Sequence, residues 1–354
     1  MQVHLISGFL GSGKTTAIQT ACTILQAAGK KVAVITNDQG IKLVDTGYFE
    51  SSSIPNRQVI NGCFCCNYAS LDEQITSLIQ TSDPDIIFAE SVGSCTDIVA
   101  TVMKPLLQSM KDVTVSVSTF ADARLLQMLY ITQKQLFNDE VQYIYAKQLE
   151  EAQHIVVSKI DLITTRELDL IRQLLKDKYP FKKITGINGT NNKSTLQWLD
   201  ALHEPVENNK PASLNIDYDI YGAGEAMLAW LDAELSIFSQ TKKAKQTAIQ
   251  LVQAIHQNIK ERGLAIGHLK FLIDDTIKIS YTATAEDLRN TEHEASSSAL
   301  LLVNARIQTS PENLSRLTNQ AIQQTETDTG CTIIKESFSA FKPGFPKPLY
   351  RIAE

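Results

Sequence analysis

Short apolar runs alternate with amphipathic stretches along the first half of the chain. The apolar runs are nearly continuous, which is typical of strands that are covered on both faces. We expect strands at residues 3–9, 31–37, 85–91, 113–120, 154–160 and 183–187. The first intervening helix is expected to end at Gly29. Strand alternating with helix predicts crossover connections and a mostly parallel sheet.

The pattern changes after the polar stretch at residues 203–213, where we place a linker. Residues 218–230 are interpreted as the lead-in to a helix, and a helix with one apolar face is expected from about Lys243 to Arg262. The expected strands are 269–274, 276–283, 299–307 and 331–337, with a helix before the last of them that has Ser310 as its N-cap. This order predicts a small α+β domain, ferredoxin-like in outline. The predicted domains are therefore residues 1–210 and 211–354.

Composition excludes several classes of function. A net charge of -6 argues against a nucleic-acid partner, which usually requires a basic face. The sequence has no apolar run of about 18 residues, so we expect no membrane span. Six cysteines without an export signal indicate reduced thiols, and hence a cytoplasmic protein.

The sequence directly after the first expected strand is GFLGSGKTT, residues 8–16, which fits the pattern G-x-x-x-x-G-K-[ST]. Its glycines let backbone N–H groups turn towards phosphate oxygens. Lys14 is expected to reach the β- and γ-phosphates, and the Thr15 hydroxyl to ligate Mg²⁺. The remaining nucleotide-binding candidates in this loop are Gly8, Gly11, Ser12, Gly13 and Thr16. The predicted fold class is α/β, a P-loop NTPase domain followed by the smaller α+β domain.

The expected strand at 154–160 ends in SKID, which contains Ser158, Lys159 and Asp161. A carboxylate at Asp161 can accept both the N1 and the N2 hydrogens of guanine, whereas adenine offers no such pair. The stem of Lys159 can lie over the base, and Ser158 takes the place of the more usual asparagine. In register with a phosphate loop, this motif favours GTP over ATP.

Two acids are expected at the carboxyl edge of the sheet, beside the phosphate loop. Asp38 follows the second strand, and Glu90 ends the strand at 85–91, where it could hold Mg²⁺ directly or through water. The backbone N–H of Gly93 could approach the γ-phosphate. We take Lys14, Asp38 and Glu90 as the catalytic candidates; the alternative for each acid is a solvated carboxylate at a strand end.

The stretch INGCFCCNYA, residues 60–69, carries three cysteines in four positions. Thiolates bind Zn²⁺ and other soft transition metals strongly. Cys63 and Cys65 would point to one side of an extended segment, and Cys66 would follow from a turn. Two alternatives stay open, a buried cluster of small apolar side chains and a redox pair of Cys65 and Cys66. The other cysteines are Cys95, a candidate supplementary ligand, and Cys22 and Cys331, which we assign to the core.

With GFLGSGKTT, GCFCC, E-S-x-G and SKID in this order, residues 1–209 resemble the CobW-like GTPases, relatives of the UreG and HypB nickel-insertion GTPases. The resemblance implies a metallochaperone or metal insertase that couples GTP hydrolysis to delivery of zinc, cobalt or another transition metal to a client metalloprotein. It also implies a GTP-dependent homodimer. Relatives generally have glutamate where this chain has Asp38, and many carry a His-rich stretch that is absent here, so the metal is not identified.

Two other functions are compatible with these motifs. One is a nucleotide-gated switch that docks to a partner without transferring metal. The other is a P-loop kinase that phosphorylates a small molecule, which would leave SKID and the cysteines without a role.

Overall fold

The computed structural model describes residues 1–37, 54–60, 62–203, 212–284 and 294–353. Asp38, one of the predicted catalytic residues, lies outside these ranges. The described chain divides into two compact units, one formed by residues up to 224 together with 345–353, and one formed by residues 225–344. The predicted boundary at residue 210 differs from this division, because residues 212–224 and 345–353 group with the first unit.

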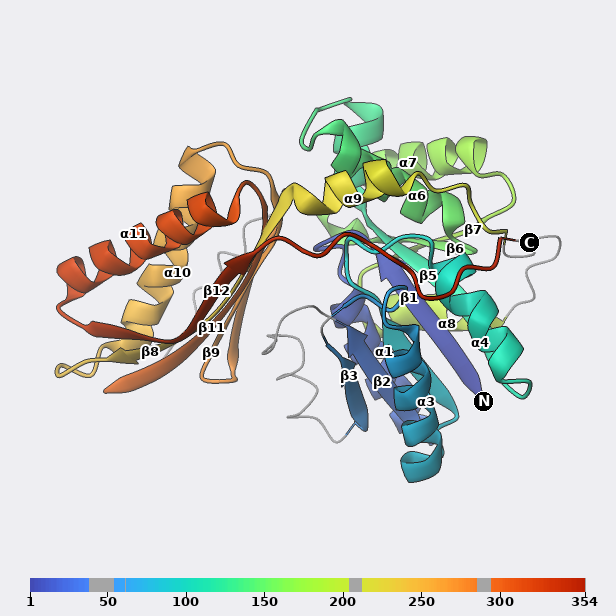
Figure 1. The fold of residues 1–354 in the computed structure, drawn as a ribbon, viewed down its shortest axis with the longest axis horizontal. Helices are drawn as coiled ribbons and strands as arrows, with labels where there is room; N and C mark the ends of the chain where they lie inside the picture. Colours follow the sequence, from blue (N-terminus) through green and yellow to red (C-terminus); the bar gives the residue numbers. More distant parts are fainter. Residues whose placement is uncertain (38–53, 61, 204–211, 285–293, 354) are drawn as a thin grey trace. The chain divides into compact units, whose positions relative to one another are not determined.

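The first unit is built on a seven-stranded sheet in the order β3-β2-β4-β1-β5-β6-β7, in which all neighbouring strands are parallel (Figure 1). Its strands are β1 Gln2–Gly8, β2 Val32–Asn37, β3 Asn56–Val59, β4 Ile86–Glu90, β5 Thr114–Asp122, β6 His154–Ser158 and β7 Lys183–Ile187. Its α-helices are α1 Lys14–Ala27, α3 Tyr68–Ser82, α4 Lys104–Ser109, α5 Ala123–Leu126, α6 Asp139–Glu151, α7 Thr165–Lys178, α8 Asn192–His203 and α9 Tyr218–Ala226. Short helical turns of other types are η1 Val99–Met103, η2 Gln127–Ile131 and η3 Ile160–Leu162.

The apolar runs form strands because both faces of the sheet are covered. Every residue of β2, β4 and β6 is buried. On one face, the apolar side of α1 packs into a cluster centred on Trp198, whose ring lies 5.1 Å from that of Phe120 and 5.9 Å from that of Phe88. Cys22 belongs to this cluster and is fully buried, as its assignment to the core predicts. The predicted parallel α/β domain is confirmed.

Parallel pairing brings the carboxyl ends of neighbouring strands to one edge of the sheet. The neighbours β2, β4, β1, β5 and β6 end at Asn37, Glu90, Gly8, Asp122 and Ser158. Ligands of open α/β sheets bind outside this edge. Most of the predicted nucleotide site therefore lies at one place in the fold.

The second unit is an antiparallel sheet in the order β10-β9-β11-β8-β12, with two helices packed together on one face. Its elements are β8 Leu228–Phe238, α10 Ala244–Glu261, β9 Ile266–Ile273, β10 Ile277–Tyr281, β11 Ser298–Gln308, α11 Pro311–Thr329 and β12 Thr332–Phe341. The Ser310 hydroxyl accepts a hydrogen bond from the Asn313 N–H at 3.2 Å, which confirms the predicted N-cap. The sheet with its two helices confirms that the second unit is a small α+β domain, as predicted.

Two strands were not expected from the sequence. Residues 218–230, interpreted as a helix lead-in, contain α9 and the start of β8, so that interpretation was incomplete. The second half of β8 alternates buried and half-buried positions, a period of two that could have revealed it. Strand β3 is only four residues long and mostly polar, and it offers no such signal. Among the described helices, none combines the length and the apolar character that a membrane crossing requires.

Candidate functional site

The conformation of the phosphate loop depends on two glycines with positive φ angles. Gly8 has a φ of 132° and Gly13 a φ of 83°. A Cβ at Gly8 would lie 2.2 Å from the carbonyl oxygen of Phe120, so β5 leaves no room for a side chain there. The buried ammonium of Lys14 crosses the loop and donates to the Gly8 carbonyl oxygen at 2.8 Å. This places a positive charge inside the curve of the loop, where phosphate would bind.

The predicted magnesium ligands lie together at the start of α1. The Thr15 hydroxyl donates to Oε1 of Glu90 at 2.9 Å, and both side chains are buried. Two adjacent ligands of an octahedral Mg²⁺ ion, at the usual metal–oxygen length, lie about 2.9 Å apart. The two oxygens are therefore close enough to be adjacent ligands of one Mg²⁺ ion. Thr15 and Glu90 would hold the ion, which neutralises the charge of the phosphates that it bridges.

SKID lies against the phosphate loop, as the guanine hypothesis requires. The Ser158 hydroxyl donates to the Ser12 carbonyl oxygen at 2.6 Å. Lys159 adopts a left-handed conformation with a φ of 58°, and its ammonium donates to the Gly11 carbonyl oxygen at 2.7 Å. Asp161 is exposed at the start of η3. The serine and lysine thus contact the backbone of the loop, and the aspartate is open to solvent.

Asp122, which was not among the residues predicted from the sequence, holds Lys159 in place. Its Oδ2 accepts from the Lys159 ammonium at 2.8 Å and pairs with Arg124 at 3.3 Å. Burial opposes ionisation of Asp122, but Lys159 and Arg124 outweigh it and keep the pKa of the carboxyl below its ordinary value. Its position at the end of β5, on the nucleotide edge, was the signal that could have revealed this role.

The loop after β4 connects the phosphate loop to a cysteine. A Cβ at Gly93 would lie 2.6 Å from the Leu10 side chain and 2.9 Å from the Leu10 nitrogen, so Gly93 packs directly against the phosphate loop. The buried amide of Gln148, on α6, donates to the carbonyl oxygens of Gly93 at 3.0 Å and Cys95 at 2.8 Å. Gln148 was missed because a single glutamine on a helix gives no signal in the sequence.

The three clustered cysteines occupy a turn. The N–H groups of Cys66 and Asn67 both donate to the Cys63 carbonyl oxygen, at 3.0 and 2.9 Å. The expectation of an extended segment was therefore wrong. The turn still brings the sulfur atoms of Cys63, Cys65 and Cys66 within 4.8 Å of one another, which an extended segment would not do for adjacent residues.

Two of the three sulfur distances at Cys65 match those of a shared metal ion, and the distance to Cys63 is shorter. In a tetrahedral zinc site with the usual Zn–S length, sulfur atoms lie about 3.8 Å apart. The Cys65 sulfur is 3.7 Å from that of Cys66, 3.7 Å from that of Cys95 and 2.7 Å from that of Cys63. None of the six cysteines, all of which lie in the described ranges, is in a disulfide, and thiols of this kind are ligands for a soft metal. The predicted supplementary ligand, Cys95, thus lies beside the cluster.

The thiols are crowded, and crowding keeps them protonated in the absence of a cation. Hydrogen bonds from the neighbouring thiols, together with burial, raise the pKa of Cys65 well above its ordinary value. The Cys63 thiol and burial raise the pKa of Cys66 to about 11. A bound metal reverses this balance because coordination requires thiolates.

Asn37 ties the cysteine turn to the nucleotide edge. From the end of β2, its side-chain amide donates to the carbonyl oxygens of Val59 at 3.0 Å and Gly62 at 2.7 Å, and its oxygen accepts from the Phe64 N–H at 3.0 Å. Asn37 is buried, so these bonds are shielded from water. Asn37 was not among the residues predicted from the sequence, although its neighbour Asp38 was.

Several known proteins are similar to this chain in sequence. The profile of the CobW/HypB/UreG nucleotide-binding domain matches residues 2–185. The zinc chaperone YjiA of Escherichia coli (strain K12) is 33% identical over 96 residues, which are 27% of this chain and 30% of that protein. The zinc chaperone YeiR of the same strain is 28% identical over 166 residues, which are 46% of this chain and 48% of that protein. The chain thus matches about half or less of the length of these two relatives.

Solved structures of two HypB proteins are also similar to this chain. HypB from Helicobacter pylori in complex with nickel gives a TM-score of 0.43 at 16% identity, over 60% of this chain and 91% of that one. HypB from Archaeoglobus fulgidus gives a TM-score of 0.39 at 19% identity, over 57% of this chain and 88% of that one. The profile match covers more than half of the 354 residues. This chain therefore belongs to the CobW/HypB/UreG family of P-loop NTPases, as its motifs predict.

Proposed function

We propose that this protein is a GTP-hydrolysing metallochaperone or metal insertase that uses its nucleotide state to hold and release a transition-metal cargo. The observation that carries the proposal is the double connection between the two sites. Asn37 joins the nucleotide edge to the cysteine turn, and the loop from Glu90 to Cys95 joins it to the fourth cysteine. The names of the curated relatives, which are zinc chaperones, support zinc as the first cargo to test, with cobalt as the next.

The residues of the nucleotide edge have distinct roles in this proposal. Lys14 supplies positive charge to the phosphates, and Thr15 and Glu90 hold Mg²⁺. The N–H of Gly93 donates a hydrogen bond to the γ-phosphate and loses this partner when GTP is hydrolysed. Because Gly93 packs against Leu10 of the phosphate loop, a movement of Gly93 on hydrolysis would also move the loop that carries Cys95. Asp38 stays a predicted catalytic residue.

A metallochaperone must pass its metal to another protein. We propose a client metalloprotein that takes the cargo and a homodimer that forms around GTP. A cytoplasmic location and the absence of a nucleic-acid partner stay predictions from the composition.

Metal affinity and nucleotide state are expected to be linked. Zinc titrations against a chelating dye, run without nucleotide, with GDP and with a non-hydrolysable GTP analogue, should give affinities that differ by about 5–150-fold, the usual range of coupling between two sites. Linkage is reciprocal, so zinc should change GTP affinity by the same factor. Equal zinc affinity in all three states would contradict the proposal and favour two independent sites.

Guanine selectivity is expected to depend on Asp161. The Asp161→Asn variant should bind GTP about 10–100-fold more weakly, because hydrogen bonds to a charged acceptor contribute about 1.5–3 kcal/mol. ATP binding should not change, which makes ATP the internal control. Competition between the two nucleotides for a fluorescent analogue measures both affinities. A tenfold preference of the unmodified protein for ATP would remove Asp161 from the base site.

A further inference from the structure

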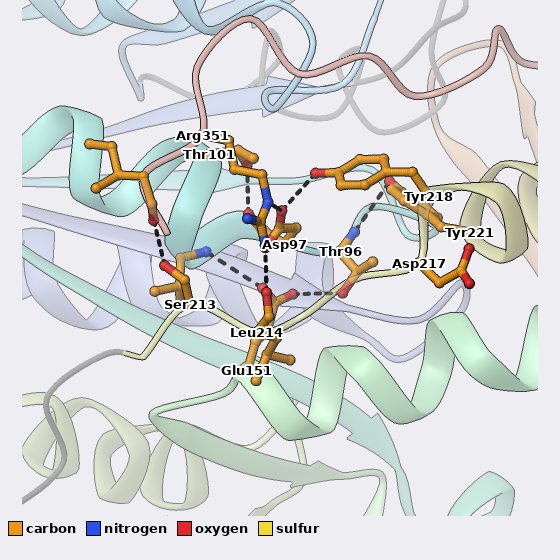
Figure 2. Close-up of polar contacts among 12 residues, drawn as sticks. Thr96, Asp97, Thr101, Glu151, Ser213, Leu214, Asp217, Tyr218, Tyr221 and Arg351 are labelled. Carbon is orange, nitrogen blue, oxygen red and sulfur yellow. Dashed lines mark hydrogen bonds and ion pairs between the residues drawn. The ribbon is translucent and has the colours of Figure 1, made fainter. Parts of the chain in front are cut away.

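The loop that carries Cys95 ends in a buried carboxylate that is held from two directions (Figure 2). Asp97 is 1% exposed and has a φ of 66°, which is uncommon for a residue with a side chain. Its Oδ2 accepts a hydrogen bond from the Tyr218 hydroxyl at 2.6 Å and one from Nε of Arg351 at 2.7 Å. The Arg351 guanidinium also donates to the Leu214 carbonyl oxygen. Arg351 is therefore fixed by a charge-assisted contact to the cysteine loop.

Arg351 belongs to the 345–353 segment, which also contacts the cysteine turn. The backbone N–H of Lys347 donates to the sulfur of Cys66 at 3.2 Å. Two residues on, the N–H of Leu349 donates to the Cys65 carbonyl oxygen at 3.3 Å. One stretch of chain thus touches both cysteine-bearing loops.

The two ends of this segment are anchored separately from the cysteines. At one end, the ring of Phe345 covers Gly222 so closely that a Cβ there would lie 2.2 Å from it. At the other end, the Ile352 N–H donates to the Ala100 carbonyl oxygen at 2.9 Å, and its carbonyl oxygen accepts from the Ser213 hydroxyl at 2.6 Å. Because both ends of the segment are held, the Lys347 N–H is kept in position to donate to the Cys66 sulfur.

We propose that the 345–353 segment closes the cysteine site over its metal cargo, with the Lys347 N–H bonded to the Cys66 sulfur and Arg351 as the positioning residue that pins the segment to Asp97. This inference rests on the proposed metal-carrying function. A donor to a ligating thiolate stabilises its charge and orients its lone pairs, and such outer partners usually change metal affinity about 10–100-fold. Release of the metal then requires the segment to move away.

The donor can be removed with almost no other change. Lys347 lies between Pro346 and Pro348, so its backbone is already restricted to extended conformations that proline also adopts. Lys347→Pro deletes the N–H, whereas Lys347→Ala deletes the side chain and keeps the N–H. We expect Lys347→Pro to weaken zinc binding about 10-fold or more and to speed zinc release to an excess of chelator by a similar factor. Lys347→Ala should match the unmodified protein in both measurements.

Arg351 gives an independent test if the proline variant misfolds. Arg351→Gln removes the charge that pairs with Asp97 and should speed zinc release, while Arg351→Lys, which keeps a cation for Asp97, should restore much of the slow release. GTP affinity measured in the absence of zinc should stay unchanged in all four variants. A loss of zinc-free GTP affinity that accompanies the loss of zinc binding would mean general damage to the fold and would overturn the positioning role.

The outcomes separate this inference from the proposed function. Tight zinc binding by the unmodified protein, with Lys347→Pro and Arg351→Gln releasing zinc at the unmodified rate, would overturn the inference alone. Absence of tight zinc binding in the unmodified protein would overturn the proposed zinc cargo first, and the inference with it.

Discussion

Replacement of Lys14 by alanine is expected to abolish tight nucleotide binding. The Lys14 ammonium is buried inside the phosphate loop, 2.8 Å from the Gly8 carbonyl oxygen, where water cannot replace it. Removal of one partner of a buried charge pair usually costs about 3–5 kcal/mol, or roughly 200–5,000-fold in affinity, because the other charge is left uncompensated. Titration of a fluorescent GTP analogue in the presence of Mg²⁺ measures the loss.

The matched control for this experiment is Lys30→Ala. Lys30 follows α1, at the far end from the phosphate loop, and is exposed. The Lys30→Ala variant should bind GTP like the unmodified protein. This result would show that the loss in Lys14→Ala comes from the phosphate loop and not from the change in net charge. Normal GTP binding by Lys14→Ala would remove the phosphate loop from the proposed function.

Simultaneous replacement of Cys63, Cys65 and Cys66 by serine is expected to remove the tight metal site. Hydroxyl groups are far poorer ligands for zinc than thiolates, and the variant would keep at most the sulfur of Cys95 near the cluster. We expect zinc affinity to fall by at least about 10⁴-fold, or about 5.5 kcal/mol. Competition with chelating dyes of graded affinity covers this range.

Cys331→Ser is the matched control, because Cys331 is buried in the second unit, where its sulfur lies 3.2 Å from the Thr247 hydroxyl. It should keep the tight site. The triple variant should keep its circular dichroism spectrum and the GTP affinity that the unmodified protein shows without zinc. Zinc affinity that survives the triple substitution would return these cysteines to the alternative of a small apolar cluster.

The motifs of this chain could be predicted from sequence because each is contiguous. The phosphate loop, SKID and the cysteines need only local spacing, and the buried strands need only an unbroken apolar run. Asn37, Gln148 and Arg351 could not be predicted in this way. Each acts on a segment that lies far away in sequence: Gln148 on Gly93, and Arg351 on Asp97. Only the packed fold makes these contacts.

The geometry of the cysteines was missed for a different reason. Alternation predicts direction only in an extended backbone. Here the Cys63 carbonyl oxygen accepts two N–H groups and closes a turn, in the part of the chain where Asn37 fixes Gly62 and Phe64. Local propensity is weak over so few residues, so tertiary contacts determined the conformation.

The first unit is discontinuous along the chain, and this has a consequence for synthesis. Residues 345–353 complete it, but they follow the 120 residues of 225–344, which form the second unit. A ribosome that adds about 5–20 residues per second needs roughly 6–24 s to make that intervening stretch. During this interval the nascent protein has its phosphate loop and all of its clustered cysteines, but neither the Lys347 donor nor Arg351. The thiols therefore emerge into the cell well before the chain that covers them.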